Sequence, residues 1–380
     1  MLEDAGARGG EIEELLGHSA AGEWWRTRPS AVPEFPLDDE PHAVDWLLYE
    51  EEARARGAWT VLQERLIQLR FPIREGMSQD QRYRAATLRG VEPFPAGPGA
   101  EIEAPDELSV EVYGTLAGRV PILATGNRRD FETLVQALTA RNEPWPVPVA
   151  MGACLVNGLN NWNRIHSYRR RWQSAGPDRE GEGAWKEEFR RLIPRKELYQ
   201  DRLIILSKGR YSGVAGDEVG EAEERWLERS MSIRREHECT HFLALRLFGA
   251  LRHDVLEELV ADFVGIVRTY GTYKPGLALR FLGLERFPEF REGGRLEVYR
   301  GEPPLSDGAF KALQELVRRG VANLARLAEA HAGKLASEQE LGRLVVAMTL
   351  LACEELAAED LVTRVEERLA ELMTGGSACS

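Results

Sequence analysis

The first part of the chain has apolar residues at helical spacing. Between residues 42 and 71 these apolar positions include Trp59, Leu62, Leu66 and Leu69. A period of three to four residues is that of an amphipathic helix, so this segment predicts one helix, or two helices broken near Gly57. The proline-rich residues 26–41 that precede it predict an extended connection.

The pattern changes after a second proline- and glycine-rich stretch, residues 91–105. Residues 107–125 alternate between apolar and polar, which predicts two strands joined near Gly118. Residues 147–156 and 201–207 are apolar runs bounded by polar residues, and both predict buried strands.

Helical spacing dominates again from about residue 220. Before that point, a short helix is expected at residues 129–140, with Asp130 as its candidate cap. Residues 337–372 begin with Ser337 and Glu340 at capping-box spacing and predict one long amphipathic helix, straight or bent midway. Strands early and helices late predict an α+β fold, with an early antiparallel or mixed β-sheet and a mainly helical C-terminal half.

Composition and charge narrow the class of protein. Of 380 residues, 43% are hydrophobic and 29% are charged, which is typical of a soluble globular protein. The formal net charge of -13 disfavours nonspecific binding to nucleic acid or anionic membranes, so neither is expected as a partner. The acidic N-terminus has no apolar core of a secretory signal, and the four cysteines are far apart. We therefore expect a cytoplasmic protein without a disulfide framework.

Residues 234–249, RREHECTHFLALRLFG, have the spacing that a zinc site requires. His237 and His241 are four residues apart and lie on the same face of a helix, so their rings can converge on one ion. Catalytic zinc sites use three protein ligands and leave one position for water. Glu238, beside the first histidine, can take a proton from that water. The motif predicts His237 and His241 as zinc ligands, Glu238 as general base, and a helix end at Gly249.

A third ligand is expected on the following helix. Asp254 and Glu257 have the spacing of an N-cap and its N3 residue, so this helix is predicted to begin at residue 255, with Glu257 occupied at the cap. Glu258 is then the preferred third ligand, with Glu257 as the alternative. Asp262 follows Glu258 by one turn on the same face. Without a metal, Glu258 and Asp262 would instead form a solvated face, with His237 a hydrogen-bonded core residue.

Small residues on the second helix, Ala261 and Gly265, would allow another helix to approach it closely. The HExxH motif followed by E-x-x-x-D on the next helix resembles the active site of the gluzincin metallopeptidases, the thermolysin-like group. The resemblance covers residues 236–262. The extended metzincin pattern is excluded, because it needs glycine and histidine where this chain has Ala244 and Leu247.

The resemblance implies a role for each matching residue. His237, His241 and Glu258 would bind Zn²⁺, and Glu238 would be the general base. Asp262 would hydrogen-bond the outer ring nitrogen of a ligand histidine, with His237 preferred, and so fix its tautomer. The residue that stabilises the oxyanion stays open among six candidates: Tyr211, Tyr270, Tyr273, Tyr299, Arg295 and Arg300.

These features together predict a zinc metallohydrolase that cleaves a peptide or small amide substrate with metal-activated water. One alternative is a dedicated biosynthetic zinc enzyme that acts on one small metabolite or peptide. The other is a non-catalytic, zinc-stabilised interaction or regulatory protein. Three segments are expected: a helical N-terminal region at 1–105, a catalytic domain with the sheet and HExxH helix at 106–275, and a helical C-terminal region at 276–380.

Overall fold

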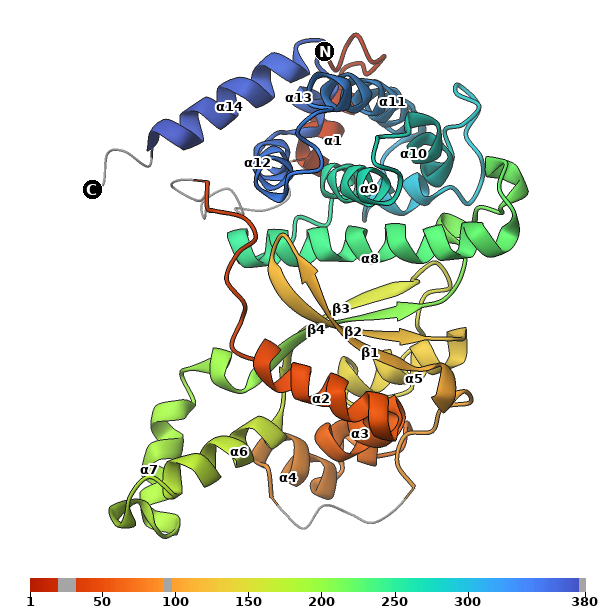
Figure 1. Cartoon of the computed structure of the whole chain (residues 1–380). Coiled ribbons are helices and arrows are strands. Elements are labelled where there is room, and N and C mark those ends of the chain that lie inside the picture. Colours follow the sequence, from red (N-terminus) through yellow and green to blue (C-terminus); the bar gives the residue numbers. More distant parts are fainter. Residues whose placement is uncertain (20–31, 92–97, 376–380) are drawn as a thin grey trace. The chain divides into compact units, whose positions relative to one another are not determined.

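The computed structural model describes residues 1–19, 32–91 and 98–375, and it has the predicted α+β fold (Figure 1). The chain divides into two compact units. The sheet unit is Asp38–Lys208, and the helical unit combines Met1–Leu37 with Gly209–Ser380. The predicted boundaries after residues 105 and 275 therefore fall inside these units. The N-terminal segment contributes to both, because residues 1–37 group with the C-terminal helices.

The sheet unit contains a mixed four-stranded sheet in the order β1-β2-β4-β3. Strand β1 pairs antiparallel with β2, β2 pairs parallel with β4, and β4 pairs antiparallel with β3. The strands are β1 Ser109–Thr115, β2 Gly118–Thr125, β3 Ala153–Asn160 and β4 Gln200–Ser207. The helices of this unit are α2 Ala43–Arg56, α3 Ala58–Arg65, α4 Gln81–Arg89, α5 Arg128–Leu138, α6 Trp162–Gln173 and α7 Glu182–Leu192.

Local sequence signals account for two of these boundaries. Gly57 separates α2 from α3 at a positive φ of 87°, as the broken helical pattern predicted. Gly118 begins β2 at a positive φ of 78°, which places the predicted strand turn correctly. The predicted cap of α5 was wrong: the side chain of Asn127 caps the helix by accepting a hydrogen bond from the backbone of Asp130. The Asp130 carboxylate instead accepts hydrogen bonds from the backbone of residues 103 and 104.

The core of the sheet unit joins α2, α3 and α5 to the sheet. Its members include Trp46, Leu62, Phe131, Leu123 and Ile205, all of them buried. Burying such large apolar side chains stabilises each by about 1.5–3 kcal/mol relative to exposure. Residues 32–41 of the predicted extended connection form neither helix nor strand, and residues 26–31 lie outside the described residues.

A buried ion pair fixes the start of α6 in the sheet unit. The fully buried Asp201 on β4 accepts a 2.6 Å hydrogen bond from the guanidinium of Arg164. Its other oxygen accepts from the indole of Trp46 at 2.8 Å and from the side-chain amide of Asn161 at 2.7 Å. Burial raises the pKa of Asp201, and these donors oppose that rise. The donor set explains how a charge is tolerated at this depth.

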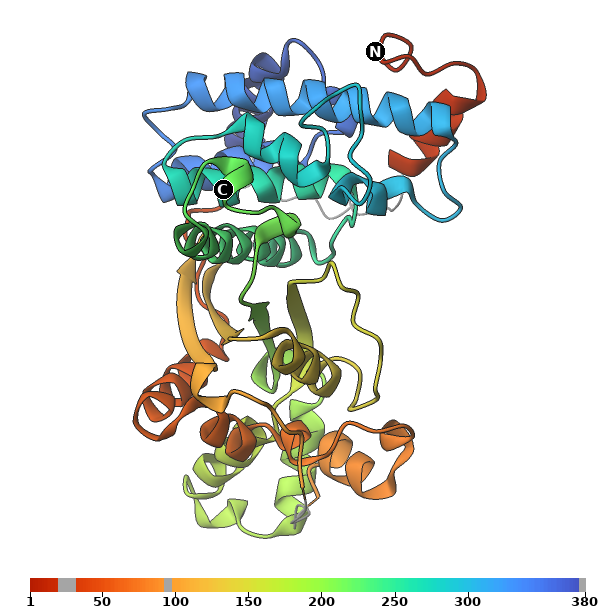
Figure 2. The ribbon, with the colours of Figure 1, turned by 90° about the vertical axis from the view of Figure 1, so that its right-hand side faces the viewer.

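The helical unit is built on two adjacent helices, α8 Glu223–Phe248 and α9 Val255–Tyr270, as Figure 2 also shows. Its other helices are α1 Gly10–Ser19, α10 Pro275–Leu282, α11 Asp307–Ala330, α12 Glu338–Thr349, α13 Cys353–Leu356 and α14 Leu361–Gly375. A 3-10 segment, η9 Arg295–Arg300, precedes α11. Among the described residues, no helix is both long and apolar enough to cross a membrane.

The single long helix predicted over residues 337–372 was wrong, because this stretch forms α12, α13 and α14. Ser337 does cap α12 as predicted, by accepting from the backbone of Glu340. The breaks are stabilised from outside the segment. Arg252 donates to the backbone carbonyls of residues 349 and 351, and Asn323 donates to those of residues 356 and 358. These donors satisfy carbonyl groups that a continuous helix would bond internally.

Candidate metal centre

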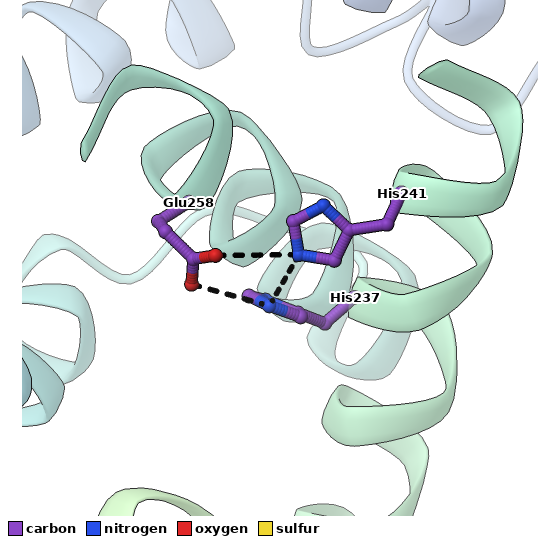
Figure 3. A group of neighbouring side chains, drawn as sticks. All are labelled: His237, His241 and Glu258. Atoms are coloured by element: carbon purple, nitrogen blue, oxygen red, sulfur yellow. Dashed lines mark hydrogen bonds and ion pairs between the residues drawn. The ribbon is translucent and has the colours of Figure 1, made fainter. Parts of the chain in front are cut away.

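Helix α8 presents the two histidines of the HExxH motif on one face. The Nε2 atoms of His237 and His241 are 3.0 Å apart (Figure 3). His237 is buried, and the side chain of His241 is 11% exposed. The i, i+4 spacing places them one turn apart, as predicted from the sequence. Gly249 ends α8 in a left-handed conformation with φ 73°, again as predicted.

Helix α9 brings a carboxylate to the same point. One oxygen of Glu258 lies 3.4 Å from His237 Nε2, and its other oxygen lies 3.4 Å from His241 Nε2 (Figure 3). One ligand atom from each of the three residues lies within 4.8 Å of the other two. In the described parts of the chain, this is the one cluster of three or more histidine, cysteine or acidic residues with metal-binding spacing.

Small residues on α9 permit this approach. A Cβ atom on Gly265 would lie 2.9 Å from the backbone oxygen of Ile233 on α8, closer than a real Cβ can come. Ala261 is completely buried. The two helix backbones are therefore in direct contact here, which allows short carboxylate side chains to reach the histidine rings.

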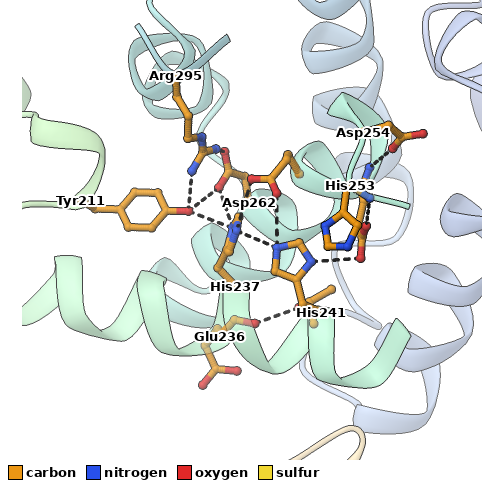
Figure 4. Close-up of polar contacts among 11 residues, drawn as sticks. Tyr211, Glu236, His237, His241, His253, Asp254, Asp262 and Arg295 are labelled. Atoms are coloured by element: carbon orange, nitrogen blue, oxygen red, sulfur yellow. Dashed lines mark hydrogen bonds and ion pairs between the residues drawn. The ribbon is translucent and has the colours of Figure 1, made fainter. Parts of the chain in front are cut away.

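The outer nitrogen of His237 faces a buried polar network (Figure 4). His237 Nδ1 lies 3.0 Å from Asp262 Oδ1 and 2.8 Å from the hydroxyl of Tyr211. Tyr211 donates to Asp262 at 2.6 Å and accepts from Arg295 at 2.8 Å. Arg295 also forms an ion pair with the other oxygen of Asp262. The proximity of Asp262 to His237 agrees with the sequence interpretation. Its contacts with Tyr211 and Arg295 were not foreseen, since both residues were considered only as oxyanion donors.

The outer nitrogen of His241 faces a different carboxylate. His241 Nδ1 lies 3.1 Å from Glu257 Oε1, and Glu257 Oε2 accepts a 2.8 Å hydrogen bond from the backbone of His253. Asp254 caps α9 as predicted, by accepting from the backbone of Glu257. The Glu257 side chain was expected at that cap, and its contact with His241 was missed. A signal was available, because consecutive helical residues point about 100° apart and can flank one ring from two sides.

The donor arrangement fits a divalent cation. Each Nδ1 faces a carboxylate, and a neutral ring that carries its proton on Nδ1 presents a lone pair at Nε2. Two lone pairs 3.0 Å apart, with a carboxylate beside them, repel one another unless a positive charge lies between them. Two zinc–donor bonds of about 2.0–2.1 Å at the tetrahedral angle place donors roughly 3.3–3.4 Å apart. In the structure the two Nε2 atoms are 3.0 Å apart, and each lies 3.4 Å from a different oxygen of Glu258.

The pKa shifts in the cluster arise from contacts between its histidines and carboxylates. Burial alone would raise the pKa of Glu258, but the charge of His237 and hydrogen bonds to both histidines hold this pKa well below its ordinary value. Burial alone would lower the pKa of His241, but hydrogen bonds to Glu257 and Glu258 raise it well above 6.5. The site therefore favours positive charge between its donors, whether carried by protons or by a metal ion.

The remaining candidate residues are the predicted general base and the predicted oxyanion donors. Glu238 is half-buried, and its charge contributes to raising the pKa of His241. Tyr299, on η9, lies within hydrogen-bonding reach of Glu258, and burial together with the charge of Glu258 raises the pKa of its phenol. Tyr273 packs on Phe263. The other two candidates make contacts elsewhere: Tyr270 with Glu221, and Arg300 with Asp307.

Comparison with known proteins identifies a family without assigning a function. A family model described as a family of unknown function, DUF7005, matches residues 1–360. The chain belongs to this family. Searches of curated proteins and of solved structures found no match. The chemistry of this chain must therefore be inferred from its own residues.

Proposed function

We propose that this chain is a zinc-dependent hydrolase with a gluzincin-like active site, acting on a peptide or small amide. The observation that carries the proposal is the convergence of His237 Nε2, His241 Nε2 and Glu258 within 4.8 Å, with a carboxylate behind each ring. Two imidazoles and one carboxylate form the donor set used by catalytic zinc sites of the HExxH class. The order of these residues on two successive helices supports the same proposal.

The residues that would hold the cation are His237, His241 and Glu258. A bound zinc ion polarises a carbonyl group and lowers the pKa of a bound water. The chain's own residues supply the rest. Asp262, supported by Tyr211 and Arg295, keeps the proton of His237 on Nδ1. The lone pair of Nε2 then remains available to the metal.

Glu238 is the proposed general base. It directly follows His237 on α8, is half-buried, and is close enough to influence the charge of His241. Its carboxylate would take a proton from the attacking water and deliver it to the leaving amine. Tyr299 is the proposed oxyanion donor, because its hydroxyl hydrogen-bonds to Glu258, whereas the hydroxyl of Tyr211 contacts the outer nitrogen of His237. A hydroxyl there would donate to the oxygen on which negative charge develops.

The first experiment measures bound metal. Purified protein is dialysed against trace zinc, and its metal content is determined by mass spectrometry. We expect about one zinc per chain in the wild type and strongly reduced zinc in His237→Ala and Glu258→Gln. Glu228→Gln, an exposed glutamate on the same helix, is the matched control and should keep its zinc. A folded wild type that retains no zinc would reject the proposal.

The second experiment tests turnover with Glu238→Gln, again beside Glu228→Gln. Both variants should keep zinc, and only Glu238→Gln should lose activity on a panel of peptides and N-acyl amides, by about 10²-fold or more. Equal turnover by the two variants would exclude Glu238 as the base. Cleavage of one small amide with no peptide cut would favour a dedicated biosynthetic enzyme. Zinc that stabilises the fold without any turnover would favour a regulatory protein.

A further inference from the structure

The contact between Glu257 and His241 is explained by neither helix capping nor metal ligation. Its backbone N–H donates to Asp254, so the helix start is already capped without its side chain. Its carboxylate approaches His241 from the Nδ1 side, at 3.1 Å, whereas Glu258 approaches from the Nε2 side. The side chain is only 5% exposed. Burying a carboxylate costs free energy unless it is paired or hydrogen-bonded, so the contacts of Glu257 must offset that cost.

Both oxygens of Glu257 are engaged. Oε1 meets the ring of His241, and Oε2 accepts from the backbone of His253 at 2.8 Å. His253 has a positive φ of 55°, an uncommon conformation for a residue other than glycine, and this turn directs its N–H toward Glu257. The turn therefore holds one oxygen of the carboxylate, and the other oxygen contacts the imidazole.

The turn itself is anchored from the C-terminal helices. Arg252 forms a 2.7 Å ion pair with Asp254 and donates to the carbonyls of residues 349 and 351, between α12 and α13. The connection therefore runs from the α12–α13 turn through Arg252, the 253–254 turn and Glu257 to the ring of His241. All of these residues belong to the helical unit.

We propose that Glu257 is a positioning residue for the second ligand histidine, one that keeps the proton of His241 on Nδ1 and its Nε2 aimed at the metal. The inference rests on the proposed metal function. Each ligand histidine then has its own positioning carboxylate, because Asp262 contacts Nδ1 of His237 through a separate network. Carboxylates in this role typically contribute 10- to 100-fold to metal affinity.

The decisive comparison uses Glu257→Gln. A glutamine oxygen can still accept from the backbone of His253, so the turn is preserved while the charge behind His241 is removed. Zinc affinity is measured by competition with a fluorescent chelator, and the stability of the metal-free protein by chemical denaturation. We expect zinc binding about 10- to 100-fold weaker than in the wild type, with stability close to that of the control. The matched control is Glu285→Gln, whose 12%-exposed carboxylate pairs with Arg291 in the same unit.

The outcomes separate this inference from the proposed function. Zinc-free wild-type protein overturns both. Wild-type protein that binds zinc, with Glu257→Gln equal to Glu285→Gln in affinity, overturns the role of Glu257 alone. A loss of affinity that only follows a loss of metal-free stability would show a structural role and also overturn the inference.

A second measurement does not depend on the variant folding. Nitrogen-15 NMR of the histidine rings in zinc-loaded wild-type protein should show His241 protonated on Nδ1 and ligated through Nε2. The opposite arrangement would overturn the inference. Glu257→Gln, if folded, should also show a changed Nδ1 shift for His241 and an unchanged one for His237, because the two rings have separate partners.

Discussion

Replacing Gly265 with alanine tests whether helix contact sets the geometry of the metal centre. The added Cβ would lie 2.9 Å from the backbone oxygen of Ile233 and 3.1 Å from its Cγ2. Carbon–oxygen contacts in proteins lie at roughly 3.3–3.6 Å, so the helices must separate by at least about 0.4 Å. The nearer neighbour is backbone, which cannot rotate away as a flexible side chain would.

Two opposing terms set the expected stability change of Gly265→Ala. Overpacking a core contact costs about 1–3 kcal/mol. Alanine in place of glycine inside a helix stabilises by about 1 kcal/mol. The net loss in unfolding free energy should therefore be about 0–2 kcal/mol. Metal affinity should fall as well, because moving α9 away from α8 moves Glu258 away from the histidines. We expect zinc binding to weaken at least about tenfold, following the loss of a ligand-positioning contact.

The assay pairs urea denaturation of metal-free protein with zinc competition against a chelator. Gly276→Ala is the control, because a Cβ added to this helical glycine on α10 would meet no atom within 4 Å, so the change should be tolerated. Gly265→Ala that binds zinc as tightly as Gly276→Ala would refute the reasoning. It would mean that the helices can part without moving Glu258 relative to the histidines.

Two further predictions concern protonation and the buried ion pair. The pKa values of His237 and His241 are raised, so protons compete with zinc even above pH 6.5, the ordinary histidine pKa. The zinc affinity should therefore fall steadily between pH 8 and pH 6 in chelator titrations. The unfolding free energy of the metal-free protein should instead increase as the pH falls. A raised histidine pKa stabilises the fold fully below pH 6.5, and this stabilisation is lost as pH rises through the folded pKa. A pH-independent affinity would contradict this account. In the sheet unit, Arg164→Ala leaves Asp201 buried without its main counter-charge and should lower unfolding free energy by about 3–5 kcal/mol. The exposed Arg191→Ala should cost less than about 1 kcal/mol, and equal losses would show that burial of the pair is unimportant.

Much of the candidate site followed from helical geometry read in the sequence. His237 and His241 face one point because residues four apart share a helix face, and Gly249 and Asp254 mark where one helix ends and the next begins. Glu258, which the sequence favoured over Glu257 as the third ligand, lies beside both Nε2 atoms, whereas Glu257 lies beside Nδ1 of His241. Its role as a ligand stays a prediction. These features depend on residues within one or two turns of each other, which is why local pattern was sufficient.

The hydrogen-bond partners of the two histidines were not fully predicted from the sequence. Tyr211 and Arg295 reach Asp262 from 51 and 33 residues away, and no local pattern records such contacts. Glu257 was assigned to the helix cap because that role is local. Its actual contact with His241 depends on how closely α9 packs against α8, and on the turn at His253.

The chain's own sequence determined the caps at Asp254 and Ser337, the strand turn and the HExxH helix, since each depends on backbone conformation or periodicity over a few residues. Only the tertiary structure decided that residues 337–372 form three helices, because no glycine or proline between Gly342 and residue 372 marks the breaks. The donors that satisfy the interrupted carbonyls, Arg252 and Asn323, come from other helices and turns. The same holds for the grouping of residues 1–37 with the C-terminal helices. Burial and hydrogen bonding between distant segments set these features, and such contacts exist only once the chain has folded.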